Sequence, residues 1–137
     1  MAALVAGWFV GYIMALLSTI ALVVLLSRAR TAAWLERWVA PDVPGVALAV
    51  PVFTGTVVGW TMVGLVLGAL FSVLDAGDGP SGPGTASLPF SIGMLGLAWL
   101  PVPPLVLLWR RYAWLWCGMA ASFAALFGWL LPYLATR

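Results

Sequence analysis

Long uninterrupted runs of apolar residues dominate this chain. Four of them stand out, and they cover residues 4–27, 47–74, 88–109 and 113–135. Each run exceeds the roughly 20 residues that an α-helix needs to cross a hydrocarbon core about 30 Å thick. Backbone groups in lipid must be hydrogen-bonded within their own segment, so the runs are expected to be helices. The pattern predicts an all-α integral membrane bundle of four transmembrane helices that forms a single domain.

The segments between these runs predict two different connections. Residues 31–40 place tryptophans and a leucine on one helical face and charged residues off it. This predicts a short helix lying in the membrane interface, with an irregular loop as the alternative. Residues 75–87 are rich in Gly, Pro, Ser and Asp, a composition typical of turns without a core, so a flexible outer loop is expected there.

The arginines predict an orientation in the membrane. All six basic residues are arginines, and five lie in the first and third connections: Arg28, Arg30, Arg37, Arg110 and Arg111. The positive-inside rule then places these two connections in the cytoplasm and both chain ends outside. No positive charge precedes the first apolar run, so we interpret that run as a retained membrane helix and not as a signal peptide.

Composition supports lipid as the solvent of this chain. Of its 137 residues, 64% are hydrophobic and only 7% are charged, whereas soluble domains carry about 25% charged residues. The net charge of +2 is not gathered into a basic run, so no nucleic-acid partner is expected. A multi-pass protein of a bacterial inner membrane, with membrane lipids around it, is the expected class and location.

Small residues in the apolar runs predict close helix packing. In the second run, Gly55 and Gly59 form one pair at spacing four, and Gly64 and Gly68 form another about 180° away on a helix. Small residues let helix backbones approach closely, so this helix is predicted to contact neighbours on opposite faces. Gly7 and Gly11, with Ala3 and Ala15, form a row of small residues on one face of the first run.

The third run is interrupted by prolines. Pro101, Pro103 and Pro104 each remove a backbone donor and crowd the carbonyl four residues earlier. A bend or break near Pro101 is therefore predicted. We favour a fixed kink over a hinge, and over a carbonyl site for a cation, because no acidic residue lies nearby.

Polar and aromatic side chains inside the runs are expected to serve packing. The hydroxyls of Thr54, Thr56 and Thr61, like those of the serines in the runs, are predicted to bond carbonyls of their own helix or a neighbouring helix. Trp60 and Trp99 lie deep in their runs and are predicted to pack between helices.

The residues that usually carry chemistry are scarce. The chain contains no histidine and one cysteine, Cys117, and no ionisable residue lies in the interior of an apolar run. Zinc-ligand spacings and nucleotide-binding motifs do not occur, so neither catalysis nor a cofactor is expected. Lipid headgroups are the one ligand that the charges suggest, because arginines suit phosphate, and the candidate contacts are Arg28, Arg30, Arg110 and Arg111.

These features favour a non-catalytic accessory or structural subunit of a larger membrane complex, whether respiratory, photosynthetic or transport-related. Its partners would be other transmembrane subunits. The alternative is a small homo-oligomeric channel or transporter with a pore formed by carbonyls near Pro101 and hydroxyls between Thr54 and Thr61. A lipid-modifying enzyme ranks lowest, because the four acidic residues all lie in connections.

Overall fold

The structure, a computed structural model, describes residues 1–28, 44–77 and 87–136. Within these ranges it is helical and contains no strand. The elements are α1 (Ala2–Arg28), α3 (Gly45–Gly77), α4 (Ser87–Trp99), α5 (Val102–Leu108), the 3-10 turn η1 (Arg110–Tyr112), α6 (Ala113–Ala125), the π turn η2 (Leu126–Leu130) and α7 (Leu131–Ala135).

These elements form four spans that are long and apolar enough to cross a membrane. The spans are Ala2–Leu26, Ala49–Leu74, Leu88–Leu108 and Arg110–Ala135. The all-helical bundle with four membrane-length helices is therefore confirmed. The segment 31–40, most of the loop 75–87, and Arg30 and Arg37 lie outside the described residues.

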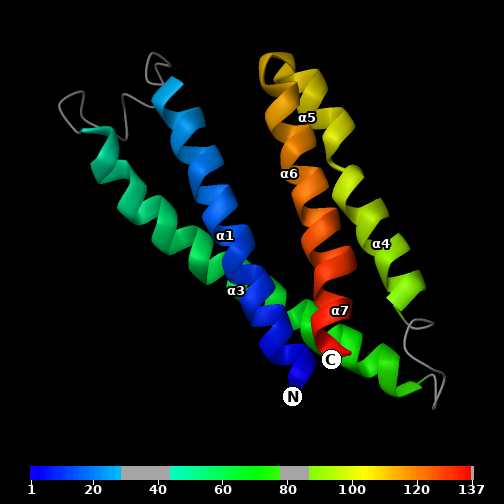
Figure 1. Cartoon of the computed structure of the whole chain (residues 1–137). Helices are drawn as coiled ribbons and strands as arrows, with labels where there is room; N and C mark the ends of the chain where they lie inside the picture. The colour runs from blue at the N-terminus through cyan, green and yellow to red at the C-terminus, as the bar shows by residue number, and fades with distance from the viewer. Residues whose placement is uncertain (29–43, 78–86, 137) are drawn as a thin grey trace.

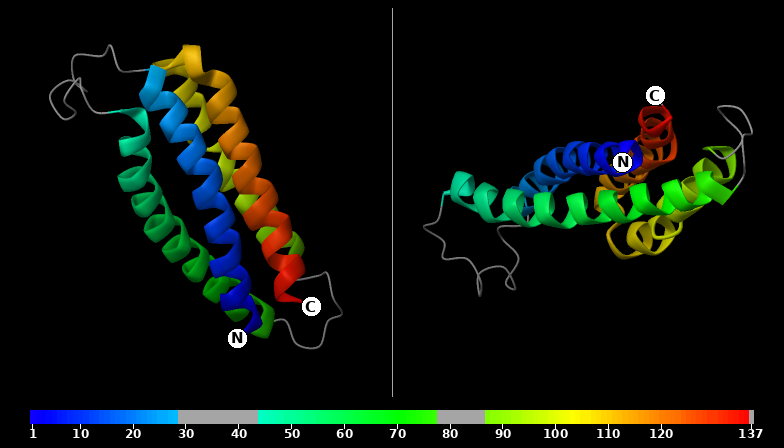
Figure 2. Two further views of the ribbon diagram at one scale, coloured as in Figure 1. Left: turned by 60° about the vertical axis from the view of Figure 1, so that its left-hand side comes forward. Right: turned by 90° about the horizontal axis from the view of Figure 1, so that it is seen from below.

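The helices are arranged as a crossed pair beside a second pair. α1 and α3 form the most extensive helix contact and cross obliquely, while α4 and α5 pack along α6 (Figure 1). The fourth span also lies against α1, which joins the two pairs (Figure 2). Both chain ends lie at the same end of the bundle, and η1 lies at the opposite end.

The third span is divided at its prolines. α4 ends at Trp99 and α5 begins at Val102, so Leu100 and Pro101 separate the two helices. Pro103 and Pro104 fall in the first turn of α5, where a helix has no partner for its amide hydrogens and proline is tolerated. The Leu105 N–H donates to the Pro101 carbonyl over 3.2 Å and starts the new helix.

The fourth span contains a π turn where another proline removes a donor. The Leu131 N–H donates to the carbonyl of Leu126, five residues earlier. Pro132 has no N–H, so the carbonyl of Gly128, four residues before it, lacks its usual helical donor. The Ser91 hydroxyl of α4 donates to this carbonyl instead, so a side chain of a neighbouring helix supplies the missing hydrogen bond.

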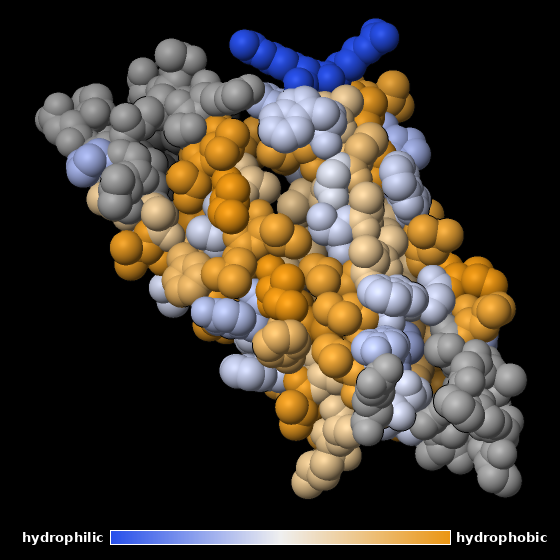
Figure 3. Space-filling view, in the orientation of Figure 1, coloured by the Kyte–Doolittle hydropathy of each residue, from blue (hydrophilic) through white to orange (hydrophobic). Residues whose placement is uncertain are grey.

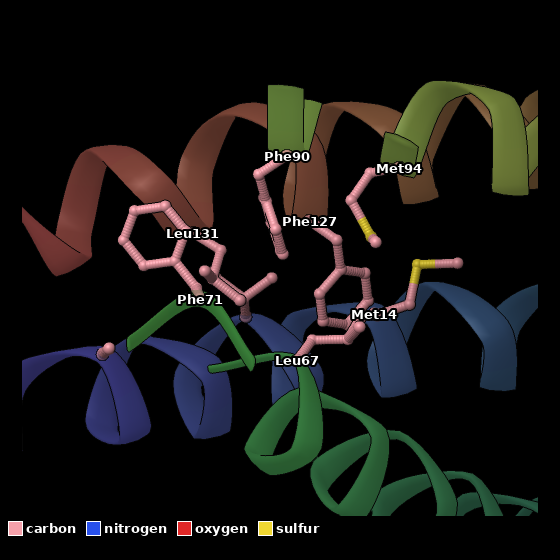
Figure 4. Packing of buried hydrophobic residues seen from close by; sticks show 9 residues of the cluster. Met14, Leu67, Phe71, Phe90, Met94, Phe127 and Leu131 are labelled. Atoms are coloured by element: carbon pink, nitrogen blue, oxygen red, sulfur yellow. The ribbon is translucent and has the colours of Figure 1, made fainter. Parts of the chain in front are cut away.

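The buried core lies where all four spans meet, toward the end that carries the termini. Its most buried side chains are Val10, Met14, Phe71, Phe127 and Leu131 (Figure 4). An edge-to-face contact between Phe71 and Phe90, with ring centroids 5.2 Å apart, joins α3 to α4. Such aromatic pairs add to the stability that apolar burial gives.

The two deep tryptophans differ in their surroundings. Trp60 packs between helices, with its ring centroid 5.9 Å from Phe123 and 6.0 Å from Phe127, as predicted. The prediction for Trp99 is wrong, since 42% of this residue is exposed. Trp99 is the last residue of α4, and at this helix end its side chain is only partly covered.

Candidate functional site

The glycines of α1 and α3 form the closest helix contact in the described chain. A Cβ added to Gly7 would lie 3.2 Å from the Gly68 Cα and would overlap the Gly64 carbonyl. One added to Gly11 would lie 3.0 Å from the Thr61 Cα. The obstacles are backbone atoms, which cannot rotate away, so only a residue without a side chain fits at these positions.

A hydrogen bond fixes the same helix pair farther along. The hydroxyls of Thr19 and Thr56 are 2.6 Å apart and bond to each other across the contact. Interhelical hydrogen bonds in membranes contribute about 0.6 kcal/mol on average. Two contacts therefore hold α1 against α3. One is the close approach of the two backbones at Gly7, Gly11, Gly64 and Gly68, which we call the glycine crossing, and the other is the Thr19–Thr56 hydrogen bond.

The second glycine pair of α3 lies on the opposite side of the helix and contacts no other helix among the described residues. A Cβ added to Gly55 or Gly59 would find no atom within 4 Å. At 100° per residue, Met62, Val66 and Val73 continue the same stripe, and they are 61%, 66% and 69% exposed. We call these five residues the outer face of α3. It is an apolar surface that no described residue of the chain covers.

The intramembrane hydroxyls are bonded locally, which confirms the expectation for them. Thr54 donates to the Val50 carbonyl over 3.0 Å, and Thr61 donates to the Val57 carbonyl over 2.6 Å. Ser72 and Ser122 likewise bond to carbonyls of their own helices. The expectation fails for Ser18, whose buried hydroxyl has no hydrogen-bond partner among the described residues.

The arginines of η1 form a cationic end. Arg110 and Arg111 are both exposed, and in Figure 3 strongly hydrophilic side chains stand at the end where α5 joins α6. No carboxylate of the described residues pairs with either guanidinium. Of the other two candidate lipid contacts, Arg28 ends α1, with a side chain outside the described part, and Arg30 lies outside it altogether.

An open apolar pocket separates α3 from α4, α5 and α6. It measures about 460 Å³, and we call it the interhelical slot. Its walls include Trp60 and Val63 of α3, Leu105 of α5 and Trp116 of α6. The described residues include no group of three or more histidine, cysteine or acidic side chains that a metal ion would need.

Three of these features were not predicted from sequence: the slot, the Thr19–Thr56 contact and the Ser91–Gly128 bond. Each depends on which helices are neighbours. The glycine pairs, in contrast, were visible as spacings. The structure brings Gly7, Gly11, Gly64 and Gly68 together and leaves Gly55 and Gly59 uncovered.

The fold and these surfaces are consistent with a multi-pass helical membrane protein. No protein-family model matches this chain, and no significant match was found among curated proteins or solved structures. Its function must therefore be inferred from its own surfaces.

Proposed function

We propose that this chain is a non-catalytic structural subunit of a larger membrane complex, and that the outer face of α3 is where a transmembrane helix of a partner subunit packs. The observation that carries the proposal is the contrast between the two glycine pairs. Gly64 and Gly68 contact α1, while an added Cβ at Gly55 or Gly59 would meet no atom of the residues that the structure describes.

The physical argument is that lipid fills such a surface poorly. Lipid tails are as apolar as leucine, so helix association in membranes depends on close packing and not on exclusion of water. A partner helix can approach the backbone at Gly55 and Gly59 as closely as α1 does at Gly64. The flanking Met62 and Val66 would then supply side-chain contacts.

The orientation that we propose puts η1 in the cytoplasm and both chain ends outside, in a bacterial inner membrane. The arginines of η1 lie at the end opposite the termini, and this separation supports the assignment under the positive-inside rule. A bend of the third span at Pro101 and an interfacial helix over 31–40 belong to the same proposal.

The test is purification from the native membrane in mild detergent, followed by native mass spectrometry. We expect copurifying subunits in a fixed ratio to the chain. Gly59→Leu should remove them while leaving the chain folded, because its side chain blocks the outer face but meets nothing inside the chain. Gly93→Leu is the matched control, since Gly93 of α4 is also exposed with no atom within 4 Å of an added Cβ.

Two outcomes would contradict the proposal. Identical copies alone in the purified species, lost in Gly59→Leu, would favour the homo-oligomeric channel or transporter, and flux through liposomes would then be measured. Equal loss of partners in Gly59→Leu and Gly93→Leu would show that the outer face of α3 has no special part in assembly.

A further inference from the structure

The interhelical slot extends along the helices that line it. Its lining runs from Trp60 to Leu67 on α3, from Leu97 to Leu105 on α4 and α5, and from Trp116 to Phe123 on α6. Each wall covers about two helical turns, or roughly 10–12 Å at 1.5 Å per residue. An apolar slot elongated along the helices suits an acyl chain better than a compact solute.

Several residues that line the slot are packed against one another. Trp60 is packed against Phe123, and against Phe127 outside the slot, while Ala98, Val102 and Ala120 of the opposite wall form a buried cluster. The volume of about 460 Å³ lies within the range of roughly 300–1,000 Å³ that is typical of small-molecule pockets. In a membrane, the lipid tails are the apolar solvent that an open slot of this size would meet.

A cationic group stands above one end of the slot. Leu105 comes five residues before Arg110, and Trp116 comes five residues after Arg111, so two walls of the slot converge on η1. Leu105 lies in the last turn of α5 and Trp116 in the first turn of α6, so the arginines lie roughly one helical turn, about 5–8 Å, beyond these lining residues. The headgroup layer of a leaflet is about 5–8 Å thick. When the arginines lie at the level of the lipid phosphates, the end of the slot therefore lies where the acyl chains begin.

Trp116 adds a second polar feature at that end. Its indole nitrogen is buried and has no hydrogen-bond partner in the part of the chain that the structure describes. A buried donor without an acceptor costs about 1–3 kcal/mol in general, and such groups call for an explanation. Trp116 lies in the first turn of α6, next to η1, so with η1 at a membrane surface a lipid ester carbonyl is the acceptor nearest to this hydrogen.

We propose that the interhelical slot binds one acyl chain of an anionic phospholipid whose phosphate is held by Arg110 and Arg111. Arginine forks suit phosphate, and no carboxylate of the described residues competes for them. The proposal requires only that η1 lie at a membrane surface, so it is independent of the partner subunits and of the orientation.

The experiment measures lipid retention by native mass spectrometry in mild detergent, with phosphatidylglycerol and phosphatidylcholine of identical acyl chains. We expect the unmodified chain to retain phosphatidylglycerol preferentially. The double variant R110Q/R111Q should keep some binding of both lipids but lose the preference, by roughly five-fold for each arginine. Val63→Trp should reduce the retention of both lipids, because Val63 lines the slot at its exposed side.

Ile92→Trp is the matched control, since Ile92 is 61% exposed on α4 and does not line the slot. Equal retention of the two lipids by the unmodified chain would overturn the proposal. So would a preference that survives in R110Q/R111Q, or equal retention in Val63→Trp and Ile92→Trp. Binding of inorganic phosphate that competes fully with the lipid and is unchanged in Val63→Trp would indicate an ion site alone.

Discussion

Single glycines decide how closely two helices approach in this protein. Gly7 and Gly64 face each other so that a Cβ on either would overlap the carbonyl of the other. Because the overlap is with backbone, relief requires the helices to separate. This loosens the Thr19–Thr56 hydrogen bond as well as the packing.

We therefore expect Gly64→Ala to destabilise the fold by about 1–3 kcal/mol, the usual cost of overpacking. The measurement is reversible unfolding in mixed micelles, followed by circular dichroism. Gly93→Ala should be neutral or stabilising by up to about 1 kcal/mol, because alanine is the better helix former and space is open there. A Gly64→Ala protein as stable as Gly93→Ala would contradict the crossing described here.

Residue spacing predicted which glycines share a face of α3, but it could not predict which of the two faces α1 contacts. At 100° per residue, Gly55 and Gly59 must oppose Gly64 and Gly68 on any helix, so the two faces follow from sequence alone. Which face is filled depends on where α1 lies, and α1 carries its own glycines at Gly7 and Gly11. Spacing within one segment contains no information about the position of its neighbour.

At the scale of an element, the fourth span shows how one helix compensates for a proline in another. Pro132 deprives the Gly128 carbonyl of its helical donor, and Ser91 of α4 donates to it. The proline and the affected carbonyl were readable from sequence by counting back four residues. The donor was not, because it lies on a different span.

Ser91→Ala should destabilise the protein by about 0.5–1.5 kcal/mol, since it leaves a buried carbonyl without this donor. Pro132→Ala restores the backbone N–H, so in that background the same substitution should cost less. A double-mutant cycle of unfolding free energies measures the difference. Equal costs in both backgrounds would mean that the serine does not compensate for the proline.

In the third span, too, prolines determine where the helix is interrupted. The sequence predicted a disruption near Pro101, and α4 and α5 are separate helices on either side of it. Three prolines close together are tolerated because two of them fall in the first turn of α5. That placement also sets Pro101 and Val102 in the wall of the interhelical slot.

For the whole molecule, the distribution of charge and aromatic residues predicts its position in the membrane. Trp8 stacks on Tyr12 and Trp129 on Tyr133 near the chain ends, and Trp109 lies beside Trp116 near η1. Aromatic residues gather at both membrane surfaces. Trp8 and Arg28 are 20 residues apart on α1, or about 30 Å, which matches the hydrocarbon core.

In intact cells, we expect a membrane-impermeant maleimide to label Thr136→Cys and not Arg111→Cys, each made in a Cys117→Ser background. Thr136 is exposed near the chain end and Arg111 is exposed in η1. Permeabilised cells serve as the control, in which both positions should react. The reverse pattern in intact cells would invert the proposed orientation.

The length of α3 has a consequence for the membrane itself. Its apolar span of 26 residues extends about 39 Å, so it fits a core of about 30 Å only when steeply inclined. α1 has an apolar span of 25 residues and is joined to α3 at the glycine crossing. Because hydrophobic mismatch favours tilt, we expect α3 to incline further about the glycine contact in a thinner bilayer, which changes its angle to α1. The width of the interhelical slot, which α3 borders, is then expected to vary with bilayer thickness.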